Sequence, residues 1–174
     1  MNPLLSRLQP YPFERLRQLF STVTPNPAFS AISLGMGEPK HPTPAFLQQA
    51  MVDAITSQPS GLAAYPATAG EPKLREAFTR WLYTRYQLEV NPATQVLPVN
   101  GSREALFALA QTLLEPSPEA VVVCPNPFYQ IYEGAALLSG AQPYFVASDP
   151  KRNFAQDWDS VPDAIWARTQ LLFV

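Results

Sequence analysis

The sequence predicts an α/β fold: a three-layer domain in which a mostly parallel sheet has helices on both faces. From residue 94 onward, short apolar runs alternate with segments of helical periodicity. Parallel strands need long crossover connections, which are usually helices, so this alternation is typical of a parallel sheet. The apolar runs are nearly continuous, as expected for strands that are buried on both faces.

The individual elements follow from this periodicity and from the positions of glycine and proline. Strands are expected over residues 94–99, 120–125, 142–148 and 170–174, and helices over 12–23, 43–58, 71–88, 102–114, 128–140 and 160–169. In the second helix, Thr43 is the expected N-cap and Pro44 the first helical residue. The chain has 20 prolines. They cluster between the expected elements, so they mark loops and do not indicate disorder.

Composition narrows the class of protein. The chain has 174 residues, 47% of them hydrophobic, and a net charge of −2 without a basic run. We therefore expect no nucleic-acid or membrane partner. Cys124 is the single cysteine of the sequence, so an internal disulfide is impossible, which fits a reducing compartment. These features predict a cytoplasmic globular protein.

The stretch "LPVNGSREALFAL" (97–109) is the first candidate site. An apolar run ends at Asn100, and a helix is expected to begin directly at Gly101 and Ser102. The first N–H groups of such a helix lack intrahelical partners and lie at the positive end of its dipole, while Arg103 adds charge. Gly101, Ser102 and Arg103 could thus bind a phosphate. The alternative at this point is an ordinary helix start capped by Asn or Ser.

Other candidate residues lie in loops. "LGMGEPKHPTP" (34–44) is a glycine- and proline-rich loop in which Gly37 leaves a bare backbone N–H. Tyr65 precedes the helix expected over 71–88, and Tyr129 follows an expected buried strand. Ligands of open α/β sheets bind at the carboxyl ends of the strands, so Tyr129 could stack on a flat ring there, although core packing is an equal alternative. His41 has no second His or Cys nearby, so no metal site is expected.

Four stretches, in this order, resemble successive blocks of the class I and II aminotransferases, the fold-type-I enzymes that depend on pyridoxal 5'-phosphate. They are "GMGEPKHPTP", "YPATAGEPKLREAF", "NGSREALFALAQTLL" and "CPNPFYQIYEGAALLSGA". The resemblance extends from about residue 12 to residue 174. Within the family, "GEPKHPTP" and the opening "NPLLSRLQPYPFERLRQL" are most similar to the bacterial branch that acts on succinyldiaminopimelate in lysine biosynthesis.

The resemblance implies roles for the candidate residues. The backbone of residues 101–103 would hold the cofactor phosphate, and Tyr129 would stack on the pyridine ring. Tyr65 would reach the cofactor phosphate of a neighbouring subunit, which implies a homodimer with shared active sites. The N–H of Gly37 would contact a substrate carboxylate. The amino group would pass between glutamate and a keto acid, the amino-acid and keto-acid substrates of the family.

The sequence departs from the family pattern in its lysines. Lys40, Lys73 and Lys151 are the three lysines of the sequence, and none has the small-residue context of the family's Schiff-base lysine. We therefore expect an N-terminal fragment without its catalytic lysine, which would be inactive alone. Residues 1–45 would be the N-terminal arm and a small-domain segment, and residues 46–174 the first part of the cofactor-binding large domain. The alternatives are a non-catalytic phosphate-binding or interaction domain and a flavodoxin-like nucleotide binder.

Overall fold

A three-stranded parallel sheet organises the second half of the chain. Its strands are β1 (Val121–Asn126), β2 (Gln142–Ala147) and β3 (Thr169–Leu172), in the order β2-β1-β3. Val121 pairs with Gln142 in the first ladder and with Thr169 in the second, and both ladders are parallel. The strands expected near 120–125, 142–148 and 170–174 are thereby confirmed.

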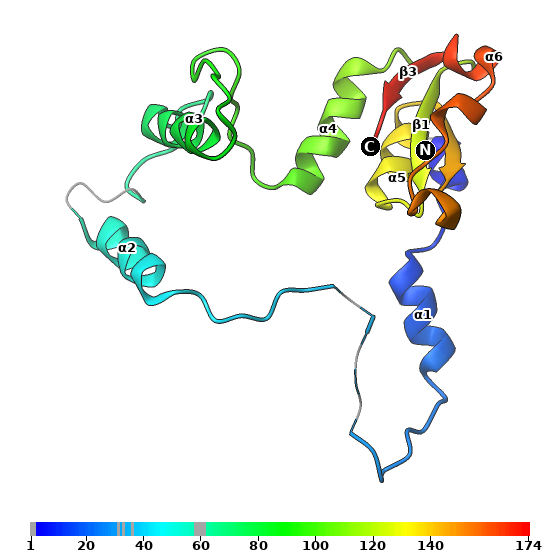
Figure 1. Cartoon of the computed structure of the whole chain (residues 1–174), viewed down its shortest axis with the longest axis horizontal. Coiled ribbons are helices and arrows are strands. Elements are labelled where there is room, and N and C mark those ends of the chain that lie inside the picture. Colours follow the sequence, from blue (N-terminus) through cyan, green and yellow to red (C-terminus); the bar gives the residue numbers. More distant parts are fainter. Residues whose placement is uncertain (1–2, 31, 33, 36, 58–61) are drawn as a thin grey trace. The chain divides into compact units, whose positions relative to one another are not determined.

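The computed structural model describes residues 3–30, 32, 34–35, 37–57 and 62–174 (Figure 1). It divides into two compact units, one formed by Met1–Pro12 with Val99–Val174 and the other by Phe13–Pro98. The sheet belongs to the first unit. The predicted domain boundary between residues 45 and 46 concerns the domains of a complete enzyme and stays a prediction.

Helical segments cover both faces of the sheet in the first unit. On one face, α4 (Ser102–Leu113) and α5 (Ile131–Leu138) enclose a core that includes Val122 and Cys124. On the other face, η3 (Trp158–Ser160) and α6 (Asp163–Trp166) contribute to a core around Val121 and Val123. Neighbouring residues of β1 alternate between the two cores, as the pleat requires. The predicted three-layer α/β arrangement is confirmed.

The strand expected over residues 94–99 is wrong. The structure has turns at residues 92–95 and irregular backbone at 96–99, and Leu97 and Val99 are exposed. A strand exists only where a neighbouring backbone completes its hydrogen bonds, and no described strand pairs with this segment. Apolar content alone does not reveal whether such a partner is present.

The regular elements that the structure describes in the first half of the chain are helices joined by long loops. Its elements are η1 (Pro3–Arg7), α1 (Pro12–Phe20), α2 (Ala45–Thr56) and α3 (Pro72–Tyr86). The predicted start of the second helix is one residue off, because Pro44 is the N-cap of α2 and Thr43 lies outside it. Gln87 ends α3 in a left-handed conformation, with its N–H donating to the carbonyl of Tyr83. Residue 36 of the predicted Gly/Pro loop, residues 31 and 33 before that loop, and residue 58 at the expected end of the second helix lie outside the described residues.

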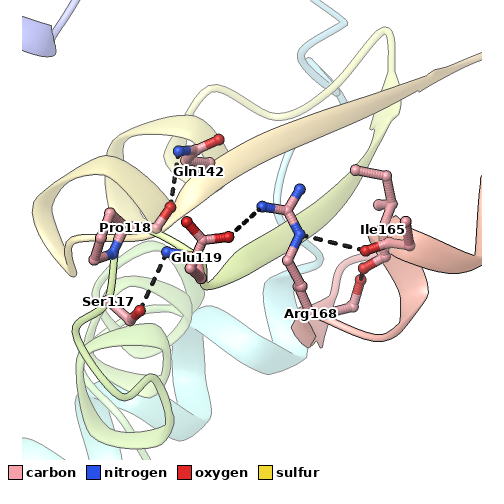
Figure 2. Close-up of polar contacts among 8 residues, drawn as sticks. Ser117, Pro118, Glu119, Gln142, Ile165 and Arg168 are labelled. Carbon is pink, nitrogen blue, oxygen red and sulfur yellow. Dashed lines mark hydrogen bonds and ion pairs between the residues drawn. The ribbon is translucent and has the colours of Figure 1, made fainter.

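A polar network holds the amino edge of the sheet, where all three strands begin (Figure 2). The side chain of Gln142 donates to the carbonyl of Pro118 at 2.8 Å, and the Glu119 N–H donates to Ser117 Oγ at 3.1 Å. Arg168 forms an ion pair with Glu119 at 2.9 Å. These contacts fix the connection between α4 and β1 onto the starts of β2 and β3.

The remaining 3-10 turn, η2 (Pro150–Arg152), follows β2 in the first unit. Asp149 caps it by accepting from the N–H of Lys151. An ion pair between Arg152 and Asp157 closes the loop that leads to η3.

Candidate functional site

The start of α4 has no capping side chain. Gly101 is the N-cap with φ 128° and ψ 144°, and no side chain caps the helix. The first intrahelical bond runs from the N–H of Ala105 to the carbonyl of Gly101, at 3.1 Å. The N–H groups of residues 102–104 precede this bond, so they are the orphan donors of the first turn. The N-cap is thus Gly101 and not a capping Asn or Ser side chain, and phosphate binding at this helix start stays a prediction.

A side-chain hydrogen bond joins the two predicted parts of the site. Arg103 Nε donates to the hydroxyl oxygen of Tyr129 at 3.1 Å, across a separation of 26 residues. This contact places the first turn of α4 and the loop after β1 together at the carboxyl edge of the sheet. The hydrogen bond to Tyr129 raises the pKa of the Arg103 guanidinium, and Glu104 acts in the same direction. Arg103 therefore carries its positive charge at neutral pH.

The ring of Tyr129 begins a short series of aromatic contacts. Tyr132 meets it edge to face, with 5.8 Å between the ring centroids. Tyr132 itself stacks on Phe173 at 4.1 Å with an interplanar angle of 5°. Phe173 is buried, whereas 39% of Tyr129 is exposed. The Tyr129 ring thus contacts Tyr132 and is still partly accessible to a ligand.

A pocket of about 340 Å³ lies beside Arg103. Residues 8–12 form one wall of this pocket, and Phe128 and the first turn of α5 form another. The pocket thus brings the N-terminal segment of the first unit next to the candidate site.

Gly37 and Tyr65 belong to one compact unit, and residues 101–103 and Tyr129 belong to the other. A Cβ built on Gly37 would meet no atom within 4 Å, so the described chain itself does not require glycine there. Tyr65 is 99% exposed. Its side chain is accessible to another molecule.

Sequence reasoning missed two residues of this site. Glu104 places its Oε2 2.9 Å from where a Cβ on Gly101 would stand, so a carboxylate lies beside the predicted phosphate position. An acidic residue in the first turn of a helix was the available signal. Phe173 contacts Tyr132, which in turn contacts Tyr129. The position of Phe173 in the last apolar run predicts that this residue is buried, but it does not predict the contact with Tyr132.

The described part of the chain contains no candidate metal site and no candidate membrane-spanning helix. No group of three or more His, Cys, Asp or Glu residues there could hold a metal ion. The helices of the same residues are all too short or too polar to cross a bilayer.

Comparison with known proteins decides the family. The family described as Aminotransferase class I and II matches residues 30–174, which is most of the chain. The chain belongs to this family. The LL-diaminopimelate aminotransferase of Nitratidesulfovibrio vulgaris (strain Hildenborough) is 30% identical over 170 residues, which are 98% of this chain and 42% of that protein. The resemblance seen in the four sequence blocks is thereby confirmed.

Solved structures of this family share the fold. An aminotransferase from Neisseria meningitidis Z2491 matches with a TM-score of 0.88 and 45% identity, over 100% of this chain and 44% of that one. The N-succinyldiaminopimelate aminotransferase of Mycobacterium tuberculosis matches with a TM-score of 0.69 and 33% identity, over 80% of this chain and 35% of that one. The chain thus spans less than half the length of these relatives.

Proposed function

We propose that this chain is the N-terminal part of a pyridoxal-phosphate-dependent aminotransferase and supplies its phosphate and ring contacts. The observation that carries the proposal is the hydrogen bond from Arg103 to Tyr129. It places an uncapped helix start and an accessible aromatic ring side by side at the carboxyl edge of a parallel sheet, where such folds bind ligands.

The residues present fit the chemical groups of the cofactor. Its phosphate matches the orphan N–H groups at the start of α4, a helix of 12 residues. The positive φ of Gly101 favours glycine, and a residue without a Cβ leaves the backbone N–H groups of this turn open to close approach. The flat ring of the cofactor matches the open ring of Tyr129. When bound, pyridoxal phosphate supplies an electron sink for chemistry at the α-carbon of an amino acid.

For substrates, we propose glutamate as amino donor and a keto acid of diaminopimelate metabolism, N-succinyl-2-amino-6-oxopimelate, as acceptor. The M. tuberculosis relative is named for N-succinyldiaminopimelate, whereas curated relatives of about 30% identity are named for LL-diaminopimelate. The unsuccinylated compound is therefore the competing substrate. Gly37 would contact a carboxylate of either one through its N–H.

We propose a cytoplasmic homodimer for the complete protein, with Tyr65 contacting the cofactor phosphate of the neighbouring subunit. The full exposure of Tyr65 supports this assignment, because its hydroxyl is available to another chain. We further propose that residues 1–174 alone do not catalyse transamination. Lys151, in the short turn after β2, is the one lysine that shares a compact unit with the α4 site, and it lacks the sequence context of the family's catalytic lysine.

The test is to express the complete reading frame, add pyridoxal phosphate and record its absorbance spectrum. We expect the bound cofactor to change the spectrum, and glutamate to change it again as the amino group is transferred. Residues 1–174 alone serve as a control and should show neither the second change nor turnover. A complete protein that binds no pyridoxal phosphate would support the non-catalytic alternative and contradict the proposal.

The acceptor is tested by comparing succinylated and free diaminopimelate as amino donors to 2-oxoglutarate, the reverse of the proposed reaction. We expect a higher kcat/KM with the succinylated compound. A preference for free LL-diaminopimelate would leave the aminotransferase proposal intact and overturn the assignment of the substrate.

A further inference from the structure

Arg103 does more in this structure than add charge to the helix start. Its side chain turns toward the loop after β1, and its Nε donates to the hydroxyl of Tyr129. The Nε–H of arginine lies in the plane of the guanidinium group, so this bond constrains both the distance and the direction of its partner. The backbone of Arg103 remains available to the phosphate position while its side chain is engaged elsewhere.

Tyr129 is thus held at two points by different elements. Arg103 from α4 holds the hydroxyl end of the ring, and Tyr132 from α5 contacts the ring edge to face. Tyr132 stacks on Phe173, which follows β3 and is buried. A ring held only by Tyr132 could pivot about its χ1 and χ2 bonds, because 39% of Tyr129 is exposed. The hydroxyl contact removes this freedom.

We propose that Arg103 is a positioning residue that fixes the orientation of the Tyr129 ring for a flat, phosphate-bearing ligand. The inference rests on the proposed function for the identity of that ligand. It differs from a simple charge effect, in which the guanidinium would act on the phosphate directly. Because the hydrogen bond lies at the surface, its loss should weaken ligand binding moderately and not abolish it.

The two effects make different predictions for a double-mutant cycle. The cycle uses Arg103→Met, Tyr129→Phe and the double variant in the complete protein, with Arg80→Met of α3 as matched control. Arg103→Met removes the donor at similar length, and Tyr129→Phe removes the acceptor and keeps the ring. We expect each single variant to weaken the dissociation constant for pyridoxal phosphate about three- to tenfold, and the double variant to be no worse than either. Arg80→Met should match the wild type.

Inorganic phosphate separates ring positioning from a charge effect. If Arg103 acts through Tyr129, its substitution should weaken binding of pyridoxal phosphate and leave the dissociation constant for inorganic phosphate nearly unchanged. The induced circular dichroism of the bound cofactor should decrease equally in both single variants, because it depends on the orientation of the ring contacts. The proposal is overturned if Arg103→Met has the same effect in the Tyr129→Phe background as in the wild type, or if it weakens both ligands equally.

A measurement without cofactor keeps the inference separate from the proposed function. In the complete protein labelled with 3-fluorotyrosine, the ¹⁹F resonance of Tyr129 is assigned as the one lost in Tyr129→Phe. We expect Arg103→Met to shift this resonance and Arg80→Met to leave it in place. An unshifted resonance would overturn the inference, whether or not the protein binds pyridoxal phosphate.

Discussion

Replacing Gly101 by alanine tests the phosphate site most directly. Its φ of 128° with ψ of 144° is a conformation that side-chain-bearing residues rarely adopt. A new Cβ would also stand 2.9 Å from Glu104 Oε2, although that flexible carboxylate can turn aside. Backbone strain therefore remains the main cost, about 1–3 kcal/mol. We expect Gly101→Ala to lower the free energy of unfolding by this amount, measured by urea denaturation.

The same substitution should also weaken binding of the cofactor to the folded protein, in addition to its effect on the free energy of unfolding. If the alanine relaxes toward negative φ, the first N–H groups of α4 turn away from the phosphate. A hydrogen bond to a charged group is worth about 1.5–3 kcal/mol, so one lost bond weakens the dissociation constant about ten- to hundredfold. Titration of the complete protein with pyridoxal phosphate measures this change.

Gly134→Ala is the matched control for this prediction. Gly134 lies inside α5, and a Cβ there would meet nothing within 4 Å. Alanine is the better helix former, so this change should raise the free energy of unfolding by about 0.5–1 kcal/mol. Opposite signs for the two substitutions are expected. If Gly101→Ala proved as harmless as Gly134→Ala, the assigned backbone geometry and the phosphate site built on it would both be refuted.

Three further substitutions test the fold. Gly70→Ala should destabilise the protein by more than about 1 kcal/mol, because Gly70 has φ 79° and a Cβ would overlap the ring of Pro98; the urea midpoint measures this, with Gly134→Ala as control. Burial raises the pKa of Cys124 from its usual 9.0 to about 12, so the native state keeps a proton that the unfolded state loses. The free energy of unfolding should therefore fall from about pH 9 toward about pH 12, and Cys124→Ala should remove that part of the decrease. Arg168→Met breaks the exposed ion pair with Glu119 and should cost less than about 1 kcal/mol; a larger loss in thermal denaturation would contradict the surface character of this pair.

The sequence predicted the elements whose formation depends on local or nearby residues. The run 121–124 is fully apolar and became the central strand, buried on both faces. Gly101 marked the start of α4, because the chain turns there with a positive φ that favours glycine. These features depend on a few adjacent residues, so they can be read without the fold.

Contacts between distant residues could not be predicted in this way. Residues 94–99 have the apolar content of a strand but no pairing partner among the described strands, and only the tertiary structure reveals this. The sequence likewise identified Arg103 and Tyr129 as candidate site residues but could not predict the hydrogen bond between them. That bond depends on the rotamers of both side chains and on the packing of Tyr132 against Phe173.

The polar groups at the amino edge of the sheet are paired within the chain, whereas backbone N–H groups at the carboxyl edge lack side-chain partners. This difference favours the carboxyl edge as the ligand-binding edge. A pocket of about 330 Å³ at the amino edge is lined by residues such as Glu119 and Arg168, but their side chains pair with each other. Gln170 in the same pocket accepts from the N–H of Glu115 at 2.8 Å. These contacts join the segment before β1 to the start of β3 and leave the side chains engaged within the protein. At the carboxyl edge, the start of α4 has no side-chain cap, and a ligand can supply the acceptor that the chain does not.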